Sequence, residues 1–262
     1  MILLLGRGGL FGQHFTKLYP DVIALSRSEC DITQQGQVMD ALRIYRPDVV
    51  INAAGVVPKS PTIHDTFATL QINSLAPRML AETCSLFGCR LIHLSTSDVF
   101  SGALGAYRED DYLSPTDLYG ISKAVGEVSQ FPHTTIRTSF VGWPDDRGRG
   151  LLAWFHNQKY AIGYDRVMWD GVTALELAKI IVEKVVPDTS KTGVIHVHGE
   201  TVSKYDILQT AKEIWDWQIE LVRESDVAVV PHHTDRTIRA SRGIHVNKSL
   251  KQQLEEMKAI WS

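Results

Sequence analysis

Three regularly spaced glycines stand directly after the first apolar run of the chain. The run covers residues 2–5, and the glycines are Gly6, Gly9 and Gly12. A short, continuously apolar run is typical of a strand that is buried on both faces of a parallel sheet, and a helical pattern follows over residues 10–18. Glycine permits a tight strand-to-helix turn and lets a pyrophosphate approach the backbone at the start of the helix. The spacing at this junction therefore predicts a dinucleotide-binding fold.

Strand-like runs and helical patterns then alternate as far as residue 138. The further strands are predicted at residues 22–25, 48–52, 90–94 and 134–137, and the helices at residues 34–45, 65–87 and from about residue 119. This alternation predicts an α/β fold, with a Rossmann-type doubly wound parallel sheet and right-handed crossovers.

The pattern becomes less regular after residue 138, where a Gly- and Pro-rich loop covers residues 141–150. Helices are predicted at 151–156, 173–186, 203–215 and 247–261, and strands at 194–197 and 219–222. Ser203 is a suitable N-cap for the third of these helices. We expect residues 1–142 and 168–198 to form the dinucleotide-binding domain. Residues 143–167 and 199–262 are expected to form a smaller substrate-binding region.

Charge and composition exclude several classes of protein. The net charge is −3 and no basic run is present, which argues against nucleic acid or a membrane surface as partner. No apolar run approaches the roughly 20 residues of a membrane span, and the first residues lack the basic region of a signal peptide. The three cysteines, Cys30, Cys84 and Cys89, include no Cys-x-x-Cys pair, so neither a disulfide framework nor a metal site is expected. These features favour a cytoplasmic protein and leave a homodimer open.

The end of the second predicted strand bears on the choice of cofactor. NAD-preferring folds often place an acidic residue there to hold the ribose hydroxyls, but this chain has Ser26 and Arg27, with Arg7 in the glycine loop as a second cation. A guanidinium suits a 2′-phosphate through bidentate hydrogen bonds. The residues therefore favour NADPH, with NADH as the alternative if Arg27 is only a solvated surface residue.

A tyrosine and a lysine stand four residues apart at the start of the helix near residue 119. Tyr119 and Lys123 would share one helical face. A neighbouring ammonium lowers the pKa of a phenol and makes it a usable acid or base. Ser95, Thr96 and Ser97 follow the fourth strand at the end that lines the ligand crevice of such sheets. Their hydroxyls are candidates for holding a substrate oxygen.

Taken in order, these segments resemble the extended short-chain dehydrogenase/reductases, and within them the dTDP-4-dehydrorhamnose reductase-like nucleotide-sugar reductases. The resemblance covers nearly the whole chain and is carried by an ordered set of segments. These are Gly6-x-x-Gly9-x-x-Gly12, Asp31-Ile32-Thr33, Arg46-Pro47-Asp48 through Asn52-Ala53-Ala54-Gly55, Ile72-Asn73-Ser74, Ser95-Thr96 through Val99-Phe100, Tyr119 to Lys123, Arg137-Thr138-Ser139, Gly171 to Ala178, and Asp235-Arg236.

The resemblance implies a role for individual residues. Thr96 matches the residue that binds the substrate carbonyl, Tyr119 the acid/base and Lys123 its partner, which also holds the nicotinamide ribose. The positions that match cofactor contacts are Gly6, Arg7, Gly9, Leu10, Phe11, Gly12, Ser26, Arg27, Asp31, Ile32, Ala53, Ala54, Gly55, Asn73, Ser139 and Phe140.

The resemblance says less about the residues that contact the substrate. The family often has Asp-Tyr after the threonine, and this chain has Ser97 and Asp98. Lys59 is placed to reach a substrate phosphate or sugar, with a solvated loop lysine as the alternative. Trp143 and Arg236 are candidates for clamping the nucleotide, although Trp143 also suits loop packing.

The resemblance implies an NAD(P)H-dependent reductase of a nucleotide-linked 4-keto-6-deoxy sugar, as in the synthesis of dTDP-rhamnose or a related surface-polysaccharide precursor. Two alternatives remain at this stage. One is an epimerase or dehydratase that recycles tightly held NAD, against which Arg27 argues. The other is a regulatory subunit that keeps the fold without catalysis.

Overall fold

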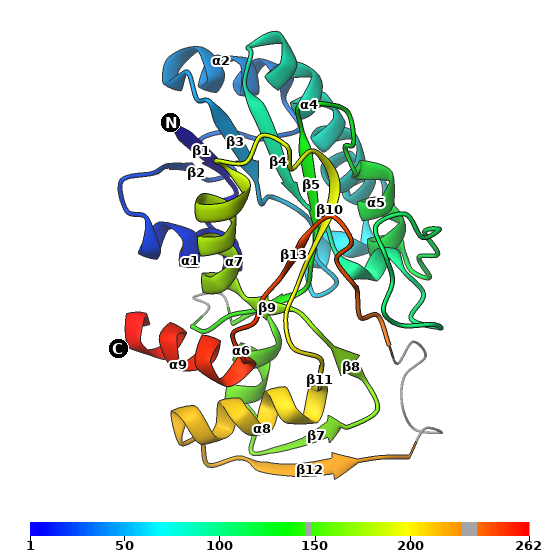
Figure 1. The fold of residues 1–262 in the computed structure, drawn as a ribbon. Helices are drawn as coiled ribbons and strands as arrows, with labels where there is room; N and C mark the ends of the chain where they lie inside the picture. The colour runs from blue at the N-terminus through cyan, green and yellow to red at the C-terminus, as the bar shows by residue number, and fades with distance from the viewer. Residues whose placement is uncertain (145–147, 227–234, 262) are drawn as a thin grey trace.

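A seven-stranded sheet forms the centre of the computed structural model, which describes residues 1–144, 148–226 and 235–261 (Figure 1). All its strand pairs are parallel, and the spatial order is β13-β10-β5-β4-β3-β1-β2. The strands are β1 (Ile2–Leu5), β2 (Ile23–Leu25), β3 (Val49–Asn52), β4 (Arg90–Leu94), β5 (Thr134–Arg137), β10 (Gly193–His198) and β13 (Ile244–His245). The predicted parallel α/β sheet is confirmed. The chain adds β2 on one side of β1 and β3 on the other, so the strand order switches between β1 and β3, where such sheets hold their ligands.

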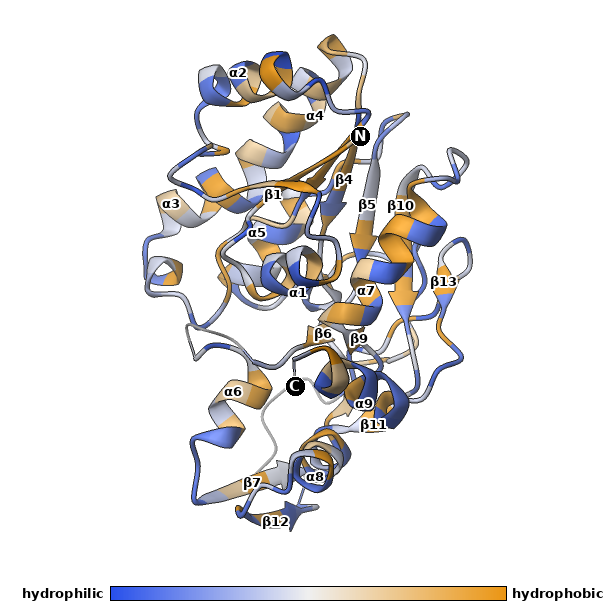
Figure 2. Cartoon of the chain, turned by 90° about the vertical axis from the view of Figure 1, so that its left-hand side faces the viewer, coloured by the Kyte–Doolittle hydropathy of each residue, from blue (hydrophilic) through white to orange (hydrophobic). Residues whose placement is uncertain are grey.

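Helices cover both faces of the sheet because its strands are apolar on both sides (Figure 2). Leu4 of β1 and Ile51 of β3 belong to the cluster that includes α1 (Leu10–Leu18) and α7 (Ala174–Ile180). Their strand neighbours face the opposite cluster, beneath α2 (Gln35–Tyr45) and α4 (Ala76–Leu86). This alternation is the period of two that a pleated strand imposes. The helix α5 (Leu118–Gly126) packs beside α4.

The long helix predicted over residues 65–87 is interrupted in the structure. A short 3-10 helix, η1 (Pro61–His64), precedes α3 (Thr66–Leu70), and a π-helical turn, η2 (Gln71–Leu75), joins α3 to α4. The helix predicted over residues 173–186 likewise ends in a π-helical segment, η4 (Ile181–Val185). A π turn holds one residue more than an α turn, a difference that hydrophobic periodicity does not reveal.

The C-terminal part of the chain packs below the sheet in Figure 1 around its own apolar cluster. Three helices surround it: α6 (Leu151–His156), α8 (Lys204–Trp215) and α9 (Leu250–Trp261). The predicted N-cap Ser203 accepts a hydrogen bond from the Asp206 N–H at 3.1 Å. The six tryptophans of the chain all belong to this cluster or pack against it.

Several strands in this part escaped prediction. They are β6 (Phe140–Val141) and its partner β9 (Val172–Thr173), β8 (Met168–Trp169) and its partner β11 (Val202–Ser203), and β7 (Tyr160–Tyr164), which pairs with β12 (Glu220–Glu224), the strand predicted at residues 219–222. Most are two residues long, and the inward positions of β7 are Ala161 and Gly163, which are too small to give an apolar signal. The domain boundaries remain a prediction. We note that β13 joins the sheet edge although it lies within the range assigned to the smaller region.

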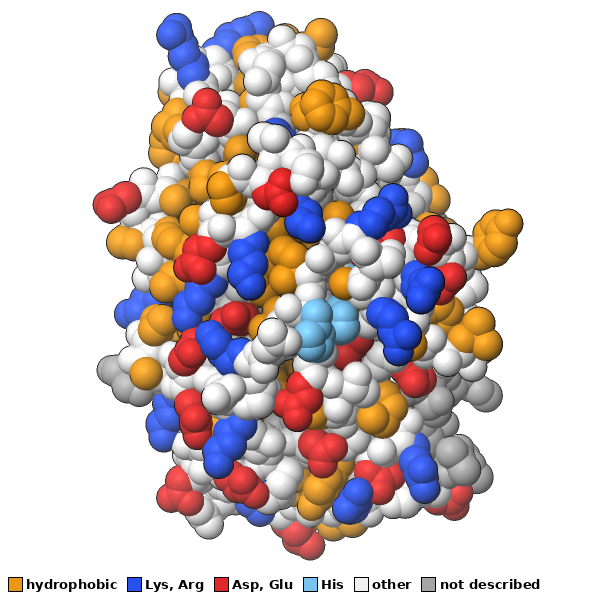
Figure 3. Space-filling view, viewed as in Figure 1, with side chains coloured by type: hydrophobic (Ala, Val, Ile, Leu, Met, Phe, Trp, Pro, Cys, Tyr) orange, Lys and Arg blue, Asp and Glu red, His pale blue; other side chains and the backbone are white. Residues whose placement is uncertain are grey.

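Charges of both signs are interspersed on the face drawn in Figure 3. Within the described residues, no helix is long and apolar enough to cross a bilayer. The same residues contain no group of three His, Cys, Asp or Glu side chains arranged to hold a metal ion.

Candidate active site

The turn after β1 packs closely against the turn after β3. Gly6 has a φ of +98°, in the left-handed region that favours glycine, and a Cβ at this position would lie 2.7 Å from the Ala54 nitrogen. A Cβ on Gly12 would lie 2.4 Å from the Gly6 carbonyl oxygen. Both positions therefore require glycine, and the close packing brings the start of α1 beside residues 53–55.

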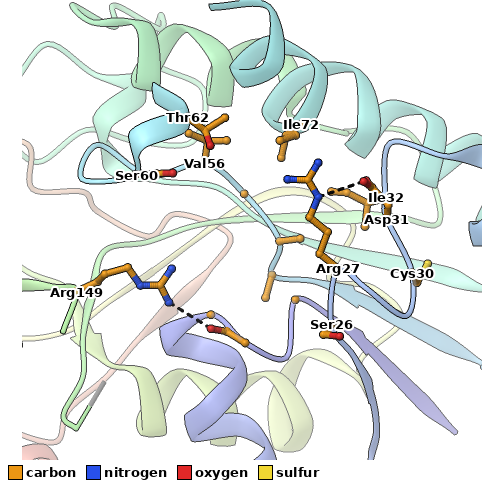
Figure 4. Close-up of a pocket in the computed structure, with 16 residues that line it drawn as sticks. Ser26, Arg27, Cys30, Asp31, Ile32, Val56, Ser60, Thr62, Ile72 and Arg149 are labelled. Atoms are coloured by element: carbon orange, nitrogen blue, oxygen red, sulfur yellow. Dashed lines mark hydrogen bonds and ion pairs between the residues drawn. The ribbon is translucent and has the colours of Figure 1, made fainter. Parts of the chain in front are cut away.

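A cavity of about 250 Å³ opens beside these two turns (Figure 4). The predicted cofactor residues that line it are Gly6, Gly9, Ser26, Arg27, Asp31, Ile32, Ala53, Ala54 and Gly55. The Arg27 side chain extends into the cavity from the β2 side, and Arg149 extends into it from the opposite side. Arg149 donates a hydrogen bond to the Gly8 carbonyl at 3.2 Å.

The two arginines that favoured a 2′-phosphate are both held by carboxylates. Arg27 Nε lies 3.1 Å from Asp31 Oδ2, and Arg7 Nη2 lies 2.9 Å from Glu29 Oε2. Burial would raise the pKa of Asp31, but hydrogen bonds from Thr33 and Arg27 outweigh it and hold this pKa below its ordinary value. Arg7 does not line the cavity, so only Arg27 keeps the predicted position.

A second cavity, of about 450 Å³, continues from the first and shares Gly9, Ala53, Gly55 and Arg149 with it. Its lining includes the predicted residues Leu10, Phe11, Lys59, Thr96, Asp98, Tyr119, Ser139 and Phe140. One continuous space therefore runs from the glycine turn to the end of β4. Arg149, which lines both parts of this space, was not among the predicted site residues.

Thr96 and Tyr119 meet where β4 ends and α5 begins. The Asp117 carboxylate caps α5 by accepting a hydrogen bond from the Gly120 N–H at 2.7 Å. A Cβ on Gly120 would lie 2.3 Å from the Asp98 carbonyl oxygen, so the first turn of α5 rests against the segment after Thr96. Burial and the Asp98 carboxylate raise the pKa of Tyr119, although a hydrogen bond with Thr96 opposes the rise.

Lys123 lies beneath the cavity lining and is 4% exposed. Its Nζ donates to the Leu94 carbonyl at 2.6 Å and lies 3.2 Å from His93 Nε2. Burial lowers the pKa of Lys123 to about 8, and the Glu127 carboxylate opposes this fall. The expectation that a neighbouring ammonium lowers the pKa of Tyr119 is not met here, because burial of the phenol dominates and the amine is directed at His93 and Leu94.

Asn73, on the π-helical turn, connects the turn after β3 to α5. Its side chain accepts from the Val56 N–H at 2.7 Å and donates to the Val56 carbonyl at 2.9 Å. The same amide nitrogen lies 3.0 Å from Ser122 Oγ. Asn73 lines neither of the two cavities and fixes the turn that does.

A smaller cavity, of about 190 Å³, adjoins the second through Asp98 and Ser139. Ser97 and Arg236, both predicted for the substrate, line it together with the unpredicted Lys204. Asp98 forms an ion pair with Arg236 and accepts a hydrogen bond from Thr96 Oγ1 at 3.1 Å. Arg236 therefore reaches the reacting end of the site through Asp98.

Trp143 does not line any of these three cavities. Its ring lies 5.2 Å from Trp217 and 4.6 Å from His156, measured between centroids, within the C-terminal apolar cluster. The structure thus places Trp143 in packing, the alternative left open for it. Lys59 faces the second cavity, with Nζ 5.6 Å from the centroid of the Trp154 ring.

Comparisons with known proteins show the family of the chain. The family model described as the RmlD substrate binding domain matches residues 1–253. A dTDP-4-dehydrorhamnose reductase of Aggregatibacter actinomycetemcomitans is 31% identical over 222 residues, which are 78% of this chain and 76% of the relative. One of Streptomyces griseus is 35% identical over 130 residues, 48% of this chain and 43% of the relative.

Solved structures agree in fold. A dTDP-4-dehydrorhamnose reductase from Bacillus anthracis in complex with NADP has a TM-score of 0.84 at 18% identity, covering 98% of both chains. A dTDP-4-dehydrorhamnose reductase from Clostridium acetobutylicum has a TM-score of 0.81 at 19% identity, covering 99% of both chains.

Proposed function

The chain belongs to the family described as the RmlD substrate binding domain, and on this premise we propose that it is an NAD(P)H-dependent reductase of a nucleotide-linked 4-keto-6-deoxy sugar. The observation that carries the proposal is the continuous space between the glycine turn and the pair Thr96 and Tyr119. Such a space accommodates a dinucleotide at one end and a carbonyl compound at the other. The chemistry fits the relatives named for reducing a dehydrorhamnose.

The residues present fit a dinucleotide. Gly6 and Gly9 line the first cavity without side chains, at the start of α1, and Arg27 lines the same cavity. A dinucleotide held by these residues would be the source of the hydride for the carbonyl carbon of the sugar. Arg27 favours the 2′-phosphate of NADPH once its ion pair with Asp31 is exchanged for the phosphate. We propose NADPH as the preferred cofactor and NADH as a weaker one.

The side chains of this chain supply the proton and the orientation. Thr96 Oγ1 and the Tyr119 hydroxyl are placed to bind the carbonyl oxygen, and Tyr119 gives its proton to that oxygen as the new hydroxyl forms. A raised pKa keeps the phenol protonated at neutral pH, as a proton donor requires. Lys123, one helical turn further along α5, would then stabilise the phenolate by its charge until solvent returns the proton.

The test is oxidation of NADPH by the purified protein with a panel of nucleotide-linked 4-keto sugars. Placed general acids contribute roughly 10²–10⁴-fold to rate, so Tyr119→Phe should lower kcat by about that factor while NADPH still binds. Tyr112 is 96% exposed, and Tyr112→Phe is the matched control that should keep full activity. Full activity in Tyr119→Phe would refute the assignment.

The same assay separates the alternatives. NAD that co-purifies, with sugar turnover but no net NADPH oxidation, would indicate an epimerase or dehydratase. Dinucleotide binding without turnover of any sugar would indicate a regulatory subunit. We further propose that the reductase works in the cytoplasm, in line with its three free cysteines. Sedimentation would decide whether it forms a homodimer.

A further inference from the structure

His93 is a fully buried histidine of β4 that lies between Asn52 of β3 and Lys123 of α5. Its Nδ1 is 3.1 Å from Asn52 Nδ2, and its Nε2 is 3.2 Å from Lys123 Nζ. Complete burial holds the pKa of His93 well below its ordinary value, and Lys123 adds to this whenever its amine is charged, so the ring is neutral in either state of the lysine. A neutral imidazole carries one proton, and the neighbours decide which nitrogen holds it.

Asn52 determines the position of that proton. The Ala54 N–H donates to Asn52 Oδ1 at 3.1 Å, so the amide oxygen must face Ala54 and the amide nitrogen must face His93. An amide nitrogen only donates, and His93 Nδ1 must therefore accept. The proton of the ring is then on Nε2.

This tautomer has a consequence for Lys123. The Nε2–H group points at Nζ, and an ammonium has no lone pair with which to accept it. The uncharged amine can accept from Nε2–H while it donates one of its own hydrogens to the Leu94 carbonyl at 2.6 Å. The contacts are satisfied together only when Lys123 is uncharged.

We propose that His93, held in the Nε2–H tautomer by Asn52, is a positioning residue that fixes the Lys123 amine and favours its uncharged form, and so sets the pH above which the lysine no longer assists Tyr119. The role of Lys123 in the reaction rests on the proposed function, whereas the tautomer does not. On the side of the sheet, the Lys123 amine thus has His93 as a hydrogen-bond partner that suits its uncharged form and not its charged form.

Other groups act on the same amine. Glu127, at the end of α5, favours the ammonium, but its carboxylate is itself engaged by Arg137 at 2.8 Å. Tyr119 on the cavity side is a neutral phenol at neutral pH, and Asp98 acts on that phenol rather than on the amine. Ser122 and Asn73 nearby carry no charge. Besides burial, His93 is therefore the neighbour whose hydrogen-bonding geometry opposes the effect of Glu127 on this amine.

The first test needs only the wild-type protein. The ¹⁵N chemical shifts of the two ring nitrogens of His93, from long-range ¹H–¹⁵N correlation at neutral pH, report the tautomer directly. His133 is an internal reference for Nε2–H, because its Nδ1 accepts from the Leu91 N–H at 3.0 Å. His196 is the opposite reference, because its Nδ1 faces the Arg239 carbonyl at 3.2 Å. Shifts like those of His133 are expected, and shifts like those of His196, or of a doubly protonated ring, would overturn the proposal.

The second test follows the titration of Lys123 through its ¹³Cε resonance and through the alkaline limb of the kcat profile. In His93→Gln, the glutamine amide oxygen can accept a hydrogen bond from the Lys123 ammonium. The Lys123 titration and the alkaline limb should therefore both move to higher pH by about one unit, which is roughly the free energy of one hydrogen bond. His133→Gln removes an equally buried histidine at the other end of the strands and should move neither. An unchanged or lowered Lys123 titration in His93→Gln would contradict the proposal. If no sugar is reduced at all, the proposed function fails while both resonance measurements still decide the role of His93.

Discussion

Replacing Glu109 by glutamine should weaken the fold in a strongly pH-dependent way. Glu109 lies in the loop before α5 and is only 5% exposed. Its Oε1 accepts from the His196 N–H at 3.1 Å and the Arg242 N–H at 3.2 Å, and its Oε2 accepts from Ser241 N–H at 2.9 Å and from Ser241 Oγ. One carboxylate thus connects the loop to β10 and to the segment before β13.

The size of the effect follows from the ionisation of this carboxyl. Burial would raise the pKa of Glu109, but the hydrogen bonds from Ser241 and the backbone outweigh it and lower the pKa to about 2. A fall of roughly two units or more from the ordinary value corresponds to about 3 kcal/mol of folding free energy. Because the folded-state pKa lies below the unfolded one, this stabilisation is present above about pH 4.5 and is lost as the pH falls toward 2. In Glu109→Gln, an NH₂ group would also face N–H donors.

The measurement is the free energy of unfolding in guanidinium chloride at several pH values between 7 and 3. Glu109→Gln should be less stable than wild type by about 3 kcal/mol at pH 7, and the difference should shrink as the pH falls toward 3. Glu82, an exposed residue of α4, provides the control Glu82→Gln, which should stay close to wild type throughout. A difference at pH 7 below about 1 kcal/mol, or one equally large at pH 3, would refute the reasoning.

Three further substitutions test other parts of the site. Arg27→Ala should raise the KM for NADPH by about ten- to a hundredfold and the KM for NADH much less, since a charge-assisted hydrogen bond is worth about 1.5–3 kcal/mol; equal effects in steady-state kinetics would remove its role at the 2′-phosphate. Arg149→Ala should weaken NADPH binding in calorimetry by about tenfold or more, because this residue stands where the two cavities join; unchanged binding would contradict that. Glu127→Gln leaves Arg137 buried without its carboxylate, so thermal unfolding should show a loss of about 3–5 kcal/mol, and a loss within error would count against the pair.

The sheet was predictable from sequence because its central strands are buried on both faces. β1 and β3 appear as nearly continuous apolar runs, and β4 and β5 as short segments with apolar residues among polar ones. The predicted ranges match all four strands within a residue or two. The pairs β6 with β9 and β8 with β11 were missed, since two-residue strands are defined by their partners and not by a local pattern. The same holds for β13.

The residues of the candidate site were also predictable only where a local sequence pattern marks them. Thr96, Tyr119 and the glycine turn were recognisable because their positions relative to a strand or helix end are local properties of the sequence. Arg149 and His93 were missed because their importance depends on contacts with Gly8 and Lys123, which are distant in the chain. The spacing of Arg27 and Asp31 could have suggested their ion pair. Only the structure shows how far the Asp31 carboxylate is buried and that it competes with a cofactor phosphate for Arg27.

The π-helical turn between α3 and α4 makes the length of this segment as important as its composition. Removing one residue from Gln71–Leu75 would return the helix to α geometry and rotate α3 by about 100° relative to α4, the angle that one residue contributes. The buried face of α3 would then turn toward solvent. Asn73 would lose either its hydrogen bonds to Val56 or its hydrogen bond to Ser122. Natural variation in this stretch should therefore consist of exchanges of side chains, with insertions and deletions confined to the loops on either side of the helix.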